Sequence, residues 1–167
     1  MIEINNANTS SDYKLIEQLA DTIWRTHYIP ITGIGQVDHM LKKYQSAEAI
    51  ANQVESGFEY YIINFEGVSV GYISILKENT TLFLSKIYVL NDYRGKKIGK
   101  IAMQFIEDKA KTYQCNVIRL TVNKNNTNSI SAYEKLGFIN TGGVVKDIGN
   151  GFVMDDYKME KTLKFIL

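Results

Sequence analysis

The stretch Tyr88–Lys111, YVLNDYRGKKIGKIAMQFIEDKAK, most constrains what this chain folds into. An apolar, β-rich run gives way to a turn that holds two glycines and four basic residues. Apolar residues then recur at i, i+3, i+4, i+7 and i+8, which predicts one buried helix face. The residues of this stripe are Ile98, Ile101, Ala102, Phe105 and Ile106. The segment therefore predicts a strand, a basic glycine turn and an amphipathic helix.

The basic turn predicts an anion-binding site. A helix N-terminus presents unpaired backbone N–H groups and a partial positive charge. Gly95 and Gly99 let the backbone wrap closely around an anion, and a diphosphate is the guest we expect. A solvated, lysine-rich helix start is the alternative interpretation. The basic residues around the turn are Arg94, Lys96, Lys97 and Lys100.

Two nucleotide-binding motifs do not fit this turn. A P-loop requires Ser or Thr after Gly-Lys to hold magnesium, and here Lys97 follows Gly95-Lys96. A dinucleotide-binding fold requires G-x-G-x-x-G and an acidic residue at the end of the next strand, and neither is present. The net charge of the chain is +1, so no global basic field predicts a nucleic-acid or membrane partner.

The remaining pattern predicts one domain, residues 1–167, of the α/β class. We expect a mixed, mostly antiparallel sheet of about six to seven strands with helices on both faces. A break is predicted at YIPITGIG, residues 28–35, which holds the only proline and two glycines. The predicted helices are one after Thr9, then Val37–Tyr44, Ala47–Glu55, the helix that begins near Ile98, and Thr127–Leu136 ending at Gly137 with a contact from Phe138. The predicted strands are Ile2–Ile4, the hairpin Phe58–Phe65 and Val68–Glu78, Thr81–Leu90, Asn116–Val122, Phe138–Ile148 and Gly151–Leu163.

Composition excludes several classes of protein. The chain is 45% hydrophobic and 22% charged, as in ordinary globular proteins, and its one cysteine excludes an internal disulfide framework. We predict no metal site. No signal-peptide pattern or long apolar run is present, so a cytoplasmic location is expected. Cys115 lies between a helix and an apolar strand without a neighbouring histidine, so we expect a small buried residue rather than a nucleophile.

A second motif lies downstream of the turn. The stretch VNKNNTNSISAYEKLGF, Val122–Phe138, leaves a strand and enters a helix. Together with the R-G-K-K-I-G turn, it resembles the GNAT superfamily of N-acetyltransferases, which carry Q/R-x-x-G-x-G/A and then an Asn-containing strand exit and a Tyr-x-x-x-Gly-Phe helix end. Lys97 stands where that pattern has its first glycine. If this position requires positive φ, the lysine is strained by about 1 kcal/mol or more.

The resemblance implies acetyl-CoA as the cofactor. Main-chain groups of Ile87, Tyr88 and Val89 would pair with the pantetheine arm. Asn126 and Ser129 would contact the cofactor further along, and Lys135 could approach a phosphate. The residues implied for the diphosphate are Arg94, Gly95, Lys96, Lys97, Ile98, Gly99 and Lys100.

Tyr133 matches the general acid of the family, which protonates the departing sulfur. A thiol pKa of about 8.5 against about 10 for tyrosine makes this reasonable. Helical spacing alone would make Tyr133 a core aromatic. The strand Thr80–Leu90 has no carboxylate, so the general base stays open. The candidates are Glu59, Glu66, Glu78, Asp155, Asp156 or a chain of water molecules.

The acceptor is expected to be a small-molecule primary amine. TIWRTHYIPI, GQVDHMLKKY and GNGFVMDDYKMEK resemble a bacterial branch that includes polyamine (spermidine/spermine) acetyltransferases. Residues that could line the acceptor slot are Trp24, Tyr28, Tyr60 and Tyr157, with Asp155 or Asp156 binding a second ammonium, although each aromatic could instead belong to the core. A protein or peptide N-acetyltransferase and a non-catalytic CoA-binding sensor are the alternatives. The sheet edges and residues 163–167 could expose a surface for pairing with a second copy, so a homodimer is a further possibility.

Overall fold

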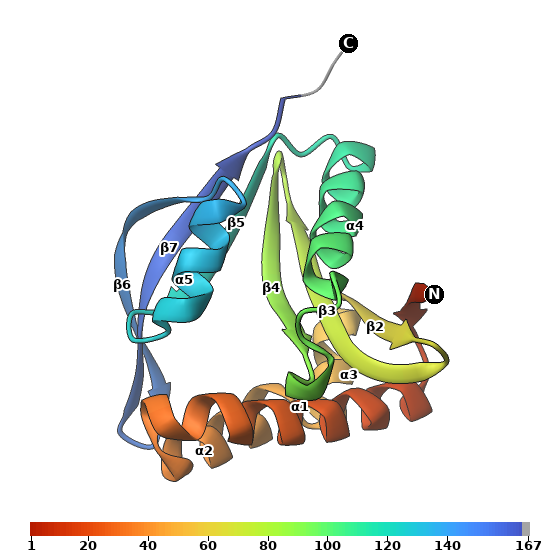
Figure 1. The fold of residues 1–167 in the computed structure, drawn as a ribbon. Helices are drawn as coiled ribbons and strands as arrows, with labels where there is room; N and C mark the ends of the chain where they lie inside the picture. Colours follow the sequence, from red (N-terminus) through yellow and green to blue (C-terminus); the bar gives the residue numbers. More distant parts are fainter. Residues whose placement is uncertain (165–167) are drawn as a thin grey trace.

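The computed structural model describes residues 1–164, and its centre is a seven-stranded sheet in the order β1-β2-β3-β4-β5-β7-β6 (Figure 1). Neighbouring strands are antiparallel except β4 and β5, which run parallel. The strands are β1 (Ile2–Ala7), β2 (Glu59–Phe65), β3 (Val68–Glu78), β4 (Thr81–Val89), β5 (Val117–Asn123), β6 (Ile139–Gly149) and β7 (Phe152–Thr162). This agrees with the predicted α/β fold and mixed sheet.

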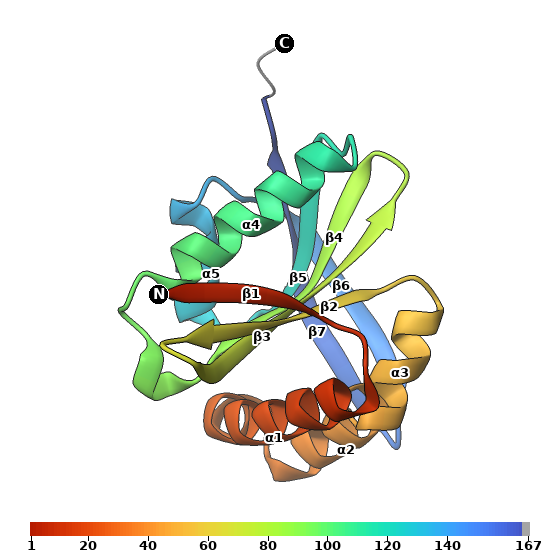
Figure 2. The ribbon, with the colours of Figure 1, turned by 90° about the vertical axis from the view of Figure 1, so that its right-hand side faces the viewer.

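Helices cover both faces of the sheet, as predicted (Figure 2). On one face, α1 to α3 pack around Trp24, Tyr60 and Tyr72, and on the other the main apolar cluster lies beneath α4. Each face therefore has its own apolar core, separated by the sheet. The helices are α1 (Ser10–Thr32), α2 (Ile34–Tyr44), α3 (Ala47–Glu55), α4 (Ile98–Thr112) and α5 (Thr127–Lys135), with a 3₁₀ turn at Asn91–Tyr93.

The sheet opens between its two central strands. The parallel pairing of β4 with β5 is limited to residues 81–83 against residues 117–119. Beyond Phe83 and Arg119 the two strands diverge, and Figure 1 shows the resulting V with α4 on one side and α5 on the other. A bulge in β4 at Ser85 breaks the register with β3, which bends the strand away. The divergence produces the space that the site occupies.

Two predictions of local structure were partly wrong. The predicted break within residues 28–35 is present at Gly33, between α1 and α2, but not at its proline: α1 continues through Pro30 to Thr32, and the Gly33 N–H donates to the Ile29 carbonyl. A proline removes one helical hydrogen bond, and near a helix end this is tolerated. Ile101 was expected in the buried stripe of α4 but is 42% exposed, and Met103 is buried instead.

Other local predictions are confirmed. The hairpin of β2 and β3 turns at Glu66 and Gly67, both at positive φ, as a two-residue turn of this kind requires. Helix α5 is followed by Gly137 at φ 98°, and the Phe138 N–H donates to the Tyr133 carbonyl. Cys115 is fully buried. Of the carboxy-terminal segment 163–167, residues 165–167 lie outside the described part of the chain.

Candidate functional site

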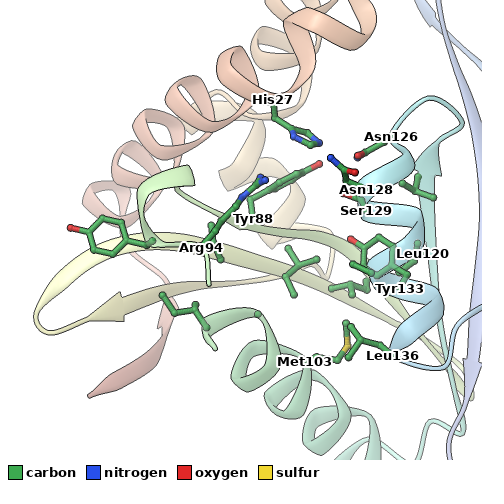
Figure 3. Close-up of a pocket in the computed structure, with 18 of the residues that line it drawn as sticks. His27, Tyr88, Arg94, Met103, Leu120, Asn126, Asn128, Ser129, Tyr133 and Leu136 are labelled. Carbon is green, nitrogen blue, oxygen red and sulfur yellow. The ribbon is translucent and has the colours of Figure 1, made fainter. Parts of the chain in front are cut away.

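A cavity of about 450 Å³ fills the V between β4 and β5 (Figure 3). One wall is β4 with the N-terminal end of α4, and the other is β5 with α5. The last part of α1 crosses the opening. The lining of the cavity includes twelve residues that the sequence singled out: Tyr28, Ile87, Tyr88, Val89, Arg94, Gly95, Lys97, Ile98, Gly99, Asn126, Ser129 and Tyr133.

The turn before α4 is an open cradle of backbone N–H groups. Gly95 has φ 78°, and Lys97, the residue before the helix, has φ 63° and ψ 12°. No side chain of residues 1–164 caps this helix, so its first N–H groups are free. A Cβ atom added at Gly95 or Gly99 would meet no atom within 4 Å. With its φ of 63°, Lys97 lies in the left-handed region, so the backbone strain that the sequence predicted for a lysine at positive φ is present.

Positive charge surrounds this cradle. Arg94, Lys96, Lys97 and Lys100 are exposed, and none makes an ion pair within the described residues. Arg94 and Lys97 line the cavity, while Lys96 and Lys100 lie outside its lining. The Lys96 ammonium lies 5.7 Å from the centre of the Phe65 ring. Unpaired cations beside free N–H groups form a site for a multiply charged anion.

Tyr133 enters the cavity from the opposite wall. The first residues of α5 follow Asn126, which is 4% exposed, and Tyr133 lies two turns further on the face that holds Ser129 and Leu136. Figure 3 shows this ring facing the space between the two walls. Burial raises the pKa of Tyr133, so its hydroxyl stays protonated at neutral pH. The face that helical spacing would assign to the core therefore lines the cavity.

Helix α1 closes the cavity with His27 and Tyr28. The Tyr28 hydroxyl lies 2.8 Å from the Tyr88 hydroxyl on β4. His27 is half-buried, and Figure 3 shows its ring at the opening near Asn126. Burial and the neighbouring Arg94 lower the pKa of His27, so the imidazole is neutral at pH 7. Sequence reasoning missed His27, because nothing local predicts that α1 spans the sheet opening.

The other proposed acceptor residues lie outside the cavity lining. Trp24 donates to the Tyr72 hydroxyl at 3.0 Å, and Tyr60 is fully buried and hydrogen-bonded to Gln45 at 3.1 Å. Both belong to a buried polar network of the α1–α3 core. The Tyr157 ring lies 5.5 Å from the Lys124 ammonium.

Two charged residues that the sequence singled out also lie outside. Asp155 pairs with Lys124 at 2.9 Å and is exposed on β7. Lys135 is exposed at the end of α5 and is absent from the lining. In the described residues, no helix is long and apolar enough to cross a membrane, and no group of three His, Cys, Asp or Glu side chains could hold a metal ion.

Comparisons with known proteins identify the family. Residues 16–138 match the model of the Acetyltransferase (GNAT) family. The structure is similar to the PaiA N-acetyltransferase of Thermoplasma acidophilum solved with coenzyme A, with a TM-score of 0.80 and 23% identity over 97% of this chain and 99% of that one. No curated protein matches the sequence significantly. The chain belongs to the GNAT family of acetyltransferases.

Two further structures share the fold. The ribosomal-protein-S18-alanine N-acetyltransferase of Escherichia coli has a TM-score of 0.73 and 16% identity, over 99% of this chain and 96% of that one. A spermidine N-acetyltransferase chimera from Vibrio cholerae and hSSAT has a TM-score of 0.70 and 16% identity, over 96% and 95%. These proteins act on different acceptors, so the shared fold does not specify one.

The cofactor is acetyl-CoA, and the cavity fits it. The free N–H groups and cations of the basic turn suit a diphosphate, and the glycines leave room for it. Past Phe83, β4 has no strand pairing on its β5 side within the described chain. An extended, amide-containing arm can therefore lie along this edge.

Proposed function

We propose that the protein transfers an acetyl group from acetyl-CoA to the primary amine of a small molecule, by direct attack in a ternary complex. The observation that carries this proposal is the position of Tyr133. Its side chain and the basic turn lie on opposite walls of one cavity. The cavity can therefore bring a bound thioester and a proton donor together.

The lining residues have distinct roles in this proposal. The turn from Arg94 to Lys100 holds the diphosphate through backbone N–H groups and nearby cations, and main-chain groups at Ile87, Tyr88 and Val89 orient the pantetheine arm. Asn126 and Ser129 contact the cofactor from the α5 side, and Lys135 would approach a phosphate only by extending from its exposed position. When bound, acetyl-CoA supplies an acetyl group activated as a thioester.

Tyr133 holds the proton that the leaving group needs. Its raised pKa keeps the hydroxyl protonated over the working range, and a thiolate with pKa near 8.5 accepts a proton more readily when the donor is already positioned. Cys115 stays outside the reaction, because it is fully buried and absent from the cavity lining. Burial also raises the pKa of its thiol, which disfavours the nucleophilic thiolate.

The experiment that tests the function is thiol release from acetyl-CoA with a panel of amines. The panel contains spermidine, spermine, putrescine, aminoglycosides, amino acids and short peptides. Selective turnover of a small amine supports the proposal, with a polyamine as one candidate acceptor because a spermidine acetyltransferase shares the fold. Turnover of peptides alone would overturn the small-molecule acceptor.

The role of Tyr133 has its own test. Tyr133→Phe should lower kcat by about 100-fold or more, the usual effect of removing a general acid, while the Kd for acetyl-CoA stays near the wild-type value. Tyr93→Phe is the control, because Tyr93 also lines the cavity but lies on the turn side. Equal losses in both variants would contradict a special role for Tyr133.

A further inference from the structure

The sequence offered five carboxylates as candidates for the general base, and in the structure they differ in their interaction partners. Glu78 pairs with Arg119 at 2.6 Å, and Asp155 pairs with Lys124 at 2.9 Å. Glu66 pairs with the N-terminal ammonium at the hairpin turn, and Glu59 accepts hydrogen bonds from the hydroxyls of two tyrosines, Tyr61 and Tyr113. Unlike these four carboxylates, Asp156 has neither an ion pair nor a tyrosine hydroxyl that donates to it within residues 1–164.

Strand alternation directs Asp156 toward the α1 side of the sheet. Along β7, Met154 packs in the α1–α3 core and Tyr157 packs in the α4 core, so Asp156 shares the face of Met154. Its partner on β5 is Asn123, next to the cavity-lining Val122. Asp155 lies on the opposite face of the same strand. Two adjacent carboxylates therefore have different surroundings.

Several charged and polar groups act electrostatically on Asp156 or are affected by it. They are Tyr28 of α1, Lys86 of β4, Thr121 of β5, Lys124 after β5 and the adjacent Asp155 of β7. Tyr28 and Thr121 line the cavity, whereas Asp156 is not part of its lining. Strand register places Asp156 next to Thr121 on the α1 face of the sheet, so its carboxylate borders the cavity. The Lys86 ammonium donates to the Ser85 hydroxyl at 2.9 Å and to the Ser85 carbonyl at 3.2 Å. Its hydrogen bonds are thus directed to its own strand, and Asp156 stays available.

We propose that Asp156 holds the ammonium group of the acceptor amine beside Tyr28 and takes its proton. This inference rests on the proposed function and supplies the base that β4 lacks. Positive charge lies at the cofactor end, around Arg94, and the carboxylate of Asp156 borders the α1 side. A CoA diphosphate and a cationic amine are thereby attracted to different parts of one cavity.

His27 lines the cavity and is another possible base, but its surroundings oppose this role. Arg94 is close enough to lower the pKa of His27, so a cation at His27 meets an unfavourable positive charge. Burial and the neighbouring Asp155 raise the pKa of Asp156 to about 6, while Lys86 and Thr121 oppose this change. The carboxylate is thus ionised at pH 7 and is a stronger base than an ordinary aspartate.

The proton balance of the step is complete. The ammonium of the acceptor gives one proton to a carboxylate oxygen of Asp156, and its nitrogen gains a free electron pair. That pair forms the new C–N bond as the C–S bond of the thioester breaks. Tyr133 gives its proton to the departing sulfur, and solvent returns a proton to the tyrosine while Asp156 and the new amide each release one.

The test compares Asp156→Asn with Asp155→Asn, a matched change one residue away on the opposite face. With 1,4-diaminobutane or another amine that the wild type accepts, Asp156→Asn should lose about 100-fold or more in kcat/KM. Asp155→Asn should lose less than about fivefold, as expected for a surface ion pair. Asp156→Glu should recover part of the activity. Equal losses in the two asparagine variants, or none, would overturn the proposal.

A second readout does not depend on turnover. Calorimetry should detect 1,4-diaminobutane binding to the CoA-saturated wild type and to Asp155→Asn, but not to Asp156→Asn. This result would support the ammonium site even if no amine is acetylated and the proposed function fails. Binding that Asp156→Asn leaves intact, or no binding to the wild type, would overturn the site, although the acetyltransferase function could still stand.

Discussion

The hydroxyl of Tyr28 on α1 and the hydroxyl of Tyr88 on β4 lie 2.8 Å apart across the α1 side of the cavity. The contact joins the helix that covers the opening to the strand that bends into it. Both rings also contact Trp24, at centroid distances of 5.5 Å and 5.6 Å. Burial raises the pKa of both tyrosines, so both hydroxyls keep their protons and one donates an ordinary hydrogen bond to the other.

Single removal of either hydroxyl should destabilise the protein more than removal of both. Tyr28→Phe or Tyr88→Phe leaves one buried hydroxyl without its partner, at a cost of about 1–3 kcal/mol, whereas the double variant leaves none. Urea unfolding of the four proteins gives the coupling energy. Tyr13→Phe is the control, since no hydrogen bond to its hydroxyl occurs in the described chain. Strictly additive losses would contradict the pairing.

Lys97→Gly should raise the free energy of unfolding by about 0.5–1 kcal/mol, because φ of 63° strains a residue with a Cβ atom. Lys97→Ala removes the same charge but keeps the Cβ atom, so it should give no such gain. Thermal and urea unfolding of both variants without cofactor provide the comparison. If alanine stabilises as much as glycine, charge repulsion in the turn is the cause instead.

Gly71 and Gly99 should respond oppositely to alanine. A Cβ atom at Gly71 would lie 2.2 Å from the carbonyl oxygen of Tyr88, so Gly71→Ala should displace β4 and cost about 1–3 kcal/mol of stability. At Gly99 a methyl group meets no protein atom within 4 Å, so stability is kept. That methyl group projects from the turn proposed to hold the diphosphate, and acetyl-CoA affinity should fall. Unfolding and calorimetric binding of each variant distinguish these effects, and a Gly99→Ala protein with wild-type affinity would argue against the cradle.

Asp156→Asn should be more stable than the wild type at pH 7 while less active. The folded pKa of about 6 exceeds the unfolded value near 4, so the carboxyl group costs stability once it ionises. The wild-type free energy of unfolding therefore falls as pH rises from about 4 to 6, by about 1 kcal/mol after allowance for solvent screening of a half-buried group. This fall should be smaller in Asp156→Asn. Parallel stability–pH curves for both proteins would contradict the raised pKa.

Lys86→Met should move the acid limb of kcat/KM to higher pH. Lys86 lowers the pKa of Asp156 by favouring the carboxylate, so its removal raises that pKa and a larger fraction of the base is protonated near pH 6. Burial lowers the pKa of Lys86 itself to about 8, and its influence should fade above that pH. Lys77→Met, an exposed change on β3, is the control. An unmoved acid limb would show that Asp156 is not the group that titrates.

Local patterns predicted most of the fold. Apolar strand patterns and the Glu66-Gly67 turn predicted the β2–β3 hairpin, and the predicted helix Ala47–Glu55 coincides with α3. The path of α1 past Pro30 was not predicted, because packing of Tyr28 and Ile29 on the core outweighs the lost hydrogen bond. Ile101 was predicted to be buried but is exposed, because the buried face of α4 is rotated relative to the predicted stripe and includes Met103 instead.

The candidate site was predicted unevenly for a physical reason. The basic turn is a continuous segment, so its glycines and cations indicate their chemistry locally. The α1 side of the cavity joins His27, Tyr88 and Asn126, residues that are far apart in the chain. Their approach depends on where β4 and β5 separate and on the length of α1. Trp24 and Tyr60 are aromatic residues of the kind expected in an acceptor slot. Hydrogen bonds to Tyr72 and Gln45 nevertheless hold them in the core.

The early end of the β4–β5 pairing has a consequence for the lifetime of the protein without its cofactor. A strand edge with free N–H and C=O groups usually lies at the border of a sheet, where charged residues or bulges prevent pairing with other chains. Here such an edge lies inside the molecule, shielded by α4, α5 and α1. A cofactor arm laid along β4 would act as a missing strand, so the supply of acetyl-CoA should govern how long each copy resists unfolding and degradation.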